Sequence, residues 1–385
     1  MSPTEREVLA YLADQQADML RLLEQLVQID SPSRCREGID KMSAAIAAFM
    51  KSRKIEVSAI PSETYGTGLR AVVPGGSGDP VVLMGHMDTV FPPGEPERRP
   101  FHTSNGRAYG PGVADMKGGL VLNAFVLDAL ARIGGLPSQV IALFTVDEEI
   151  GSPWSRTMIE KVCRGARAVF NAEPGRPNGD FVTARNGGFF FRVEITGKAA
   201  HSGVNIQQGI NAVSEAARKV LALEDLADPA KGITVNAGAL HGGTAFNIVA
   251  QSATLDAEVR YRQVSDRQRL LSAIQEIAST SFVKDTACKL TFHGEFPPME
   301  ENAGSQALAA LYTEAASSCG LDVKGNFSGG CSDAGFTSSI DIPTLCAVGP
   351  VGGLPHTDEE YLDLSSLVPR AQALALAILR LIKTT

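Results

Sequence analysis

Histidine and carboxylate side chains follow several short apolar runs of this sequence. His86 and Asp88 directly follow one such run, and the acidic triplet 147–149 directly follows another. The other candidates in comparable segments are Asp115, Glu173 and His356. Nitrogen and oxygen ligands without a thiolate suit zinc or a similar divalent ion that keeps a coordination position for water. The sequence therefore predicts a divalent metal site built from two histidines and three carboxylates, with one glutamate left over.

Each of these segments also has an interpretation that needs no metal. Asp115 lies in a glycine-rich turn before a helical segment, where a carboxylate commonly caps the helix. The triplet 147–149 resembles a solvated acidic loop. An acidic triplet directly after so apolar a run is nevertheless unfavourable unless a cation lies above it. Within the triplet, one carboxylate can bind metal while its neighbour transfers protons. Asp88 can orient the imidazole of His86 without binding the metal itself.

The apolar runs predict the strands that position these residues. Continuous apolar runs suit strands buried on both faces, as in a mostly parallel sheet with helices on each side. These runs are residues 81–85, 140–146, 168–171 and 344–348, and helical periodicity is present at residues 4–28, 37–53, 117–133 and 365–383. Open α/β sheets place their ligand sites at the carboxyl ends of the parallel strands, which is where the candidate residues fall.

Residues 183–297 have a different pattern. Strand-like alternation and helical periodicity follow one another there in the order β-α-β-β-α-β, which predicts a ferredoxin-like domain inserted into the α/β domain. The domain boundaries predicted from this change are residues 1–182 and 298–385 for the α/β domain and 183–297 for the insertion. The exposed sheet edges of such an insertion favour pairing of two copies, so we expect a homodimer.

Composition excludes several classes of function. The 385 residues carry a net charge of −8 and no basic stripe, which argues against a nucleic-acid partner. No apolar run approaches the roughly 18 residues that span a bilayer, so no membrane interaction is expected. The acidic N-terminus predicts a helix capped by Ser2 and Glu5 instead of a signal peptide. Six scattered cysteines then predict reduced thiols and a cytoplasmic protein.

Several blocks in the same order give the chain a specific resemblance. These blocks are residues 85–90, 110–119, 145–152, 173–174, 197–203 and 356–358. With them, nearly the whole chain resembles the di-zinc peptidase family of glutamate carboxypeptidase, aminoacylases and succinyl-diaminopimelate desuccinylase. Among these branches it looks most like the bacterial glutamate carboxypeptidase. The resemblance implies a catalytic domain that carries an inserted lid and dimerisation domain.

The resemblance also implies a ligand set for two zinc ions per chain. Asp115 would bridge the two ions. His86 and Glu173 would complete one site, and Glu149 and His356 would complete the other. Cobalt and manganese are other divalent ions that such a site accepts.

Roles for further residues come from the same resemblance. Glu148 would be the general base, and Asp88 would orient a metal-binding histidine. His201 would belong to the lid and stabilise the oxyanion in the active site of the partner subunit. Asn247 and Arg260 would meet the substrate, with Arg260 holding the carboxylate of the released amino acid.

These roles predict a zinc-dependent amide hydrolase of the carboxypeptidase type. Its substrate would be a small N-acyl amino acid or peptide with a free carboxylate. The alternatives are an aminoacylase or dipeptidase of the same family, and a relative that binds ligands without catalysis. A serine nucleophile at Ser332 is disfavoured, because the segment 330–334 lacks the last glycine of a nucleophile elbow.

Two departures from the family pattern bear on specificity. Residues 292–297 contain no arginine, whereas glutamate-specific members carry one where the lid returns to the catalytic domain, and Glu295 would repel a second carboxylate. Met116 follows Asp115 where many relatives have a second acid. The first departure argues against strict specificity for glutamate, and neither alters the ligand set.

Overall fold

The chain folds into two compact units. The computed structural model describes residues 1–383. The large unit comprises Met1–Ala184, Glu301–Ser328 and the described residues from Ser332 onward. The small unit comprises Arg185–Glu300 and Gly329–Cys331. Each unit has a hydrophobic core of its own.

A mixed sheet forms the centre of the large unit. Its strand order is β1-β2-β6-β3-β7-β14-β8-β13. The neighbours β6, β3, β7 and β14 run parallel, whereas β2 is antiparallel to β6, and β8 is antiparallel to β14. The strands are β1 (Glu56–Ser62), β2 (Gly66–Val73), β3 (Gly75–His86), β6 (Leu136–Thr145), β7 (Ala168–Asn171), β8 (Phe181–Arg185), β13 (Gly325–Ser328) and β14 (Thr344–Cys346). The parallel centre confirms the predicted α/β class.

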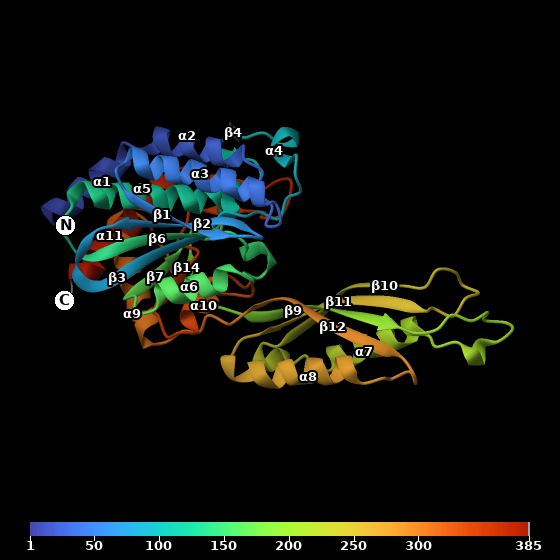
Figure 1. Ribbon diagram of the computed structural model, residues 1–385. Helices are drawn as coiled ribbons and strands as arrows, with labels where there is room; N and C mark the ends of the chain where they lie inside the picture. Colours follow the sequence, from blue (N-terminus) through green and yellow to red (C-terminus); the bar gives the residue numbers. More distant parts are fainter. Residues whose placement is uncertain (384–385) are drawn as a thin grey trace. The chain divides into compact units, whose positions relative to one another are not determined.

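Helices cover both faces of this sheet because its central strands are apolar on both sides. Helices α3 and α5 lie over one face, and α6 and α10 lie over the other (Figure 1). The helices are α1 (Pro3–Ala13), α2 (Gln16–Val27), α3 (Arg36–Ser52), α4 (Glu95–Arg98), α5 (Gly118–Ile133), α6 (Ser155–Cys163), α9 (Ala303–Ser318), α10 (Ala334–Ser338) and α11 (Leu364–Lys383). The predicted capping box of Ser2 and Glu5 begins α1. The periodicity at residues 4–28 belongs to two helices, which are separated by Asp14 and Gln15.

Helix α11 is a core element of the large unit. By length and composition it is the one helix in the described chain that is apolar enough to cross a membrane. Of its most apolar 18-residue stretch, 67% is buried inside the protein. It packs against α1, α5 and α9. Burial against other helices explains its apolar composition.

A small antiparallel sheet was not predicted from the sequence. It joins β4 (His102–Ser104) and β5 (Arg107–Tyr109) to β15 (Gly352–Gly353) and β16 (Tyr361–Asp363) in the order β15-β16-β5-β4. These strands have two or three residues each, which is too short for a periodicity to be recognised. The sheet fixes the ends of the loop that carries His356.

The small unit is a four-stranded antiparallel sheet with two helices on one face (Figure 1). Its elements are β9 (Gly187–Thr196), α7 (Ala212–Glu224), β10 (Thr234–Gly242), β11 (Ser252–Tyr261), α8 (Arg267–Ser279) and β12 (Ala287–Phe296). The strand order is β10-β11-β9-β12. Element order and strand order confirm the predicted ferredoxin-like fold.

Lys219 joins the two helices of the small unit. Its side chain is fully buried on α7, and its Nζ lies 3.0 Å from Oε1 of Glu215. The same Nζ donates to the carbonyl oxygens of Ile277, Ala278 and Thr280, at 2.7–3.1 Å. Those carbonyls lie at the C-terminal end of α8, where a cation is favourable.

We expect Lys219→Met to destabilise the small unit by about 3–5 kcal/mol, because the buried carboxylate of Glu215 would lose its cation. Arg218→Gln is the matched control on the exposed face of the same helix, and its effect should stay within about 0.5 kcal/mol. Urea unfolding followed by circular dichroism measures both. Equal midpoints for the two variants would contradict the prediction.

Candidate metal centre

His86 is the last residue of β3 and is almost completely buried. Its Nδ1 lies 3.0 Å from the carbonyl oxygen of Asp88 and 3.4 Å from the carboxylate oxygen Oδ1 of the same residue. Its Nε2 points the other way and lies 3.2 Å from Oδ1 of Asp115. One ring nitrogen is thus held by Asp88, and the other is presented to a group of acids.

Asp115 lies between two histidines that come from distant parts of the chain. Its Oδ1 faces Nε2 of His86, and its Oδ2 lies 3.4 Å from Nε2 of His356. Glu173 adds an oxygen 3.8 Å from Nε2 of His86, and Glu149 adds one 3.3 Å from Nε2 of His356. The arrangement consists of two histidine–carboxylate pairs that share one aspartate.

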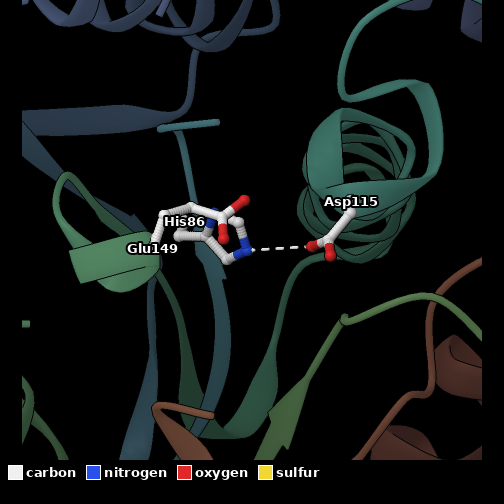
Figure 2. Close-up of side chains that lie close together, drawn as sticks. All are labelled: His86, Asp115 and Glu149. Atoms are coloured by element: carbon white, nitrogen blue, oxygen red, sulfur yellow. Dashed lines mark hydrogen bonds and ion pairs between the residues drawn. The ribbon is translucent and has the colours of Figure 1, made fainter. Parts of the chain in front are cut away.

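Donor atoms of this group are close enough to bind a single ion. His86, Asp115 and Glu149 each offer one ligand atom, and these three atoms lie within 4.8 Å of one another. Figure 2 shows the carboxylate of Glu149 beside the imidazole of His86, with Asp115 facing that ring from the start of the next helix. Imidazole nitrogen and carboxylate oxygen are donors that zinc and related divalent ions prefer.

The clustered acids at this site favour a bound cation. Burial raises the pKa of Glu149 to about 7 and that of Glu148 well above its usual value. Hydrogen bonds to Asp115 and Glu149 raise the pKa of His356 to about 10. Oε1 of Glu149 is buried and has no hydrogen-bond partner. Divalent cations would offset the clustered negative charge in place of these protons, so the residues fit metal ions and their binding should strengthen as the pH rises.

Asp88 holds both sides of the site together. Besides its contacts with His86, its carboxylate accepts hydrogen bonds from the backbone N–H groups of Glu148 and Glu149, each at 3.1 Å. Ser33 donates a third hydrogen bond from its hydroxyl, at 2.6 Å. Asp88 is completely buried. Sequence reasoning missed Ser33, which no motif marks, because its position depends on the contact between its loop and the end of β3.

Glu148 has a carboxylate that no structural interaction occupies. Its side chain is 9% exposed, and among the described residues it forms no hydrogen bond or ion pair through its carboxylate. Its neighbour Asp147 instead accepts backbone N–H groups of Trp154 and Ser155, at 2.7 and 3.2 Å. The turn after β6 therefore fixes one acid, directs one to His356, and leaves one free to exchange protons.

Glu360 positions the backbone that carries Asp115. It is fully buried, and its two carboxylate oxygens accept the N–H groups of Gly112, Ala114 and Asp115, each at 2.9 Å. Gly112 has a φ of 71°, the left-handed region in which glycine is favoured. Sequence reasoning missed Glu360, since nothing in the letters distinguishes it from the exposed Glu359.

We expect Glu360→Gln to weaken metal binding about 10–100-fold, because an amide oxygen cannot accept all three N–H groups that orient the Asp115 segment. Glu359→Gln is the matched control, because its side chain is exposed. Titration with zinc against a competing chelator measures both affinities. An unchanged affinity in Glu360→Gln would show that the segment keeps its geometry without this carboxylate.

The remaining predicted residues, His201, Asn247 and Arg260, lie in the small unit. His201 is exposed, and its Nδ1 accepts the N–H of Gly203 at 3.1 Å, which leaves the proton of the neutral ring on Nε2. Asn247 is exposed, and its backbone carbonyl accepts the N–H of Ser202 at 3.0 Å. The second contact joins the two loops that carry His201 and Asn247.

Arg260 is already paired within the small unit. Its Nε and Nη2 donate to the two carboxylate oxygens of Glu258, at 3.0 and 2.9 Å. Its Nη1 donates to the carbonyl oxygen of Gly329 at 3.1 Å. The hydrogen bonds to Glu258 raise the pKa of Arg260. Sequence analysis did not predict this pairing, although the two residues lie on the same face of one strand.

The two departures from the family pattern have structural counterparts. Met116 is fully buried, and its sulfur accepts the backbone N–H of His86 at 3.3 Å. Glu295 forms a bidentate ion pair with Arg267, in which Nη2 lies 2.8 Å from Oε2.

Ser332, which was disfavoured as a nucleophile, is buried, and its hydroxyl lies 3.4 Å from the sulfur of Cys346. This contact offers no base that could activate the hydroxyl.

The chain matches a known protein family over most of its length. Residues 82–380 match the model of peptidase family M20/M25/M40. The chain belongs to this family. It is therefore a hydrolase that acts on amide or peptide bonds, and the predicted resemblance is confirmed.

Individual relatives have several related activities. The chain is 30% identical to carboxypeptidase G2 of Pseudomonas sp. (strain RS-16) over 96% of this chain and 90% of that protein. It is 27% identical to acetylornithine deacetylase of Klebsiella pneumoniae (strain 342), over 63% of this chain and 67% of that protein. An M20 family metallo-carboxypeptidase from Sulfolobus solfataricus has a similar fold, with a TM-score of 0.80 and 18% identity over 95% of this chain and 99% of that chain.

Proposed function

We propose that this M20 hydrolase releases the C-terminal amino acid from a small N-acyl amino acid or peptide, using two zinc ions per chain. The observation that carries this proposal is the position of Asp115 between two histidine–carboxylate pairs, beside the unoccupied carboxylate of Glu148. His86, Asp115 and Glu173 would hold one ion, and Asp115, Glu149 and His356 would hold the other. The similarity to carboxypeptidase G2 supports the direction of cleavage.

Bound divalent ions would polarise the amide carbonyl and lower the pKa of a water molecule. In our proposal Glu148 takes the proton from that water and later passes it to the leaving amine. Burial prepares it for this role, because a carboxylate with a raised pKa accepts a proton near neutral pH. Asp88 keeps His86 and the backbone of Glu148 in register, which makes it a positioning residue.

His201 would stabilise the oxyanion, and Asn247 would contact the substrate. The acceptor contact at Nδ1 of His201 fixes a proton on Nε2, so this ring can donate to developing negative charge. We propose that it acts in the active site of the partner subunit.

A homodimer through the small unit follows from this assignment, and the exposed apolar side chains of that unit support it. Phe246 is fully exposed, Val204 is 79% exposed and Leu221 is 63% exposed. Strand β10 is also an edge strand of its sheet, so its outer edge is available for pairing. We place the dimer in the cytoplasm, where its six free cysteines would stay reduced.

Substrate choice would depend on Arg260. Glu258 already accepts hydrogen bonds from Nε and Nη2 of Arg260. The carboxylate of a substrate therefore has to replace Glu258 or share the guanidinium group with it. Arg267 is likewise paired, with Glu295, so neither arginine is left without an anion to bind a second carboxylate. These pairings favour products with a single carboxylate. The second candidate, an aminoacylase or dipeptidase acting on neutral residues, is favoured by the same pairings.

We expect Glu258→Gln to lower the KM for N-acyl amino acids several-fold, up to about tenfold, with little change in kcat, because Arg260 would lose a competing charge. Asp256→Asn is the matched control. Asp256 lies on the same strand as Glu258, but it is paired with Arg192 of β9. Steady-state kinetics of amino-acid release measures both. A rise in KM would mean that Glu258 itself orients the arginine for the substrate.

The experiment that tests the proposal as a whole is amino-acid release from a panel of N-acyl amino acids and dipeptides, with zinc supplied and then chelated. The acyl group is kept constant while the C-terminal residue varies. Chelator-sensitive release of the C-terminal residue supports the proposal. Preference for glutamate or aspartate would favour the glutamate carboxypeptidases, and preference for neutral residues would favour the aminoacylases and dipeptidases. No release from any substrate would contradict the proposed cleavage and its substrate class.

A further inference from the structure

A second concave site lies on the large unit, and none of the proposed metal ligands lines it. It is an open groove of about 700 Å³ between the β1–β2 strands and helix α6. The residues that line it include Ile60, Arg70, Trp154, Met158, Lys161 and Val162. Volumes of this size and linings that are mostly apolar with a few polar groups are typical of small-molecule sites.

The floor of the groove depends on a glycine. Gly68 on β2 lies directly beneath Met158 of α6, and a Cβ at this position would lie 3.2 Å from both Cε and Sδ of the methionine. Met158 is buried, whereas Trp154 is only half-buried one turn earlier on the same side of the groove. Because Gly68 has no side chain, α6 can pack closely against β2 at this point. The indole of Trp154 then forms one wall of the groove.

The rim of the groove carries two cations that lack an anionic partner. Within the described part of the chain, neither Arg70 nor Lys161 forms an ion pair or donates a side-chain hydrogen bond, and no acidic side chain lines the groove. The nearest acid along α6, Glu160, is bound to Arg156 at 2.9 Å. In a protein with a net charge of −8, two unpaired cations beside an apolar groove are complementary to an anion with an apolar body.

We propose that this groove binds an amphipathic carboxylate, whose alkyl or aryl body lies against Trp154 and Met158 and whose carboxylate meets Arg70 and Lys161. An arginine fork and an ammonium group are suitable donors for such a head group. The groove is distinct from the metal centre but adjoins it through the chain. The backbone N–H of Trp154 donates to Asp147, the residue before Glu148.

Trp154 makes the site directly observable because it is the only tryptophan in the sequence. The probe is octanoate, with octylammonium and octanol as ligands of matched length and different charge. Titrations follow the emission of Trp154 in the zinc-loaded protein and are repeated after chelation. Arg70→Gln and Lys161→Gln remove the two cations, and Lys51→Gln on the exposed face of α3 is the matched control.

We expect a saturable change in emission with octanoate that persists after chelation. Octylammonium and octanol should bind at least about tenfold more weakly, and each groove variant should weaken octanoate binding by about three- to tenfold. Lys51→Gln should bind as the unaltered protein does.

Four results would overturn the proposal. Equal responses to the three ligands, or equal affinities in all variants, would indicate unspecific apolar adsorption. Loss of the octanoate response on chelation would place the carboxylate at the metal centre. A change in Trp154 emission on dilution without any ligand would identify a second copy of this chain as the occupant of the groove.

Discussion

Replacing Glu148 with alanine is expected to leave zinc bound and to lower turnover by about 10²–10⁴-fold. The carboxylate of Glu148 is buried beside the proposed metal ligands but contacts neither histidine, whereas that of Glu149 lies 3.3 Å from His356. Removing Glu148 therefore deletes a proton acceptor and no proposed ligand. Zinc content after dialysis and the rate of amino-acid release are the two measurements.

The neighbouring residue provides the control. Glu149→Ala should lose zinc from the site that it shares with His356, and turnover should fall for that reason. Glu148→Gln separates proton transfer from packing, because the amide keeps the volume of the side chain but does not accept the proton. Normal turnover in Glu148→Ala would rule out the proposed base. Loss of zinc in that variant would make Glu148 a ligand.

Replacing His201 with alanine is expected to slow turnover by about 10²–10³-fold with normal zinc content, which is the usual effect of removing one oxyanion donor. In the small unit this ring is exposed and has only a local contact, with the N–H of Gly203. Its removal should therefore leave the free energy of unfolding almost unchanged. A turnover loss without a stability loss is the result that a purely structural role would not give.

Mixing two inactive variants tests whether His201 acts across a dimer. If Glu148→Ala and His201→Ala subunits are unfolded together and refolded, about half of the dimers will be mixed, and one site in each mixed dimer will have both groups, so about a quarter of the normal activity should return. Recovery of activity supports action in the partner's site. If His201 acts within its own chain, no mixed site has both groups and no activity returns.

The local sequence was sufficient to predict the donors of the site and the elements that present them. His86 follows β3 and the acidic triplet follows β6, as the ends of apolar runs predicted, because a strand buried on both faces must be apolar until it reaches the sheet edge. The β-α-β-β-α-β order of the small unit was equally readable, since its strands alternate and its helices carry regular apolar faces.

The pairing of those donors depends on the tertiary structure. Contacts between residues far apart in the chain determine which acid of the triplet faces His356. They also place Asp115 between two histidines. Glu360 reaches Asp115 only because a sheet of very short strands holds its loop. Local sequence carries no periodicity for such strands and no sign that one of two adjacent glutamates is buried. The pairing of Arg260 with Glu258 was likewise decided by side-chain packing, because a sequence specifies which charges are present but not which of them neutralise one another.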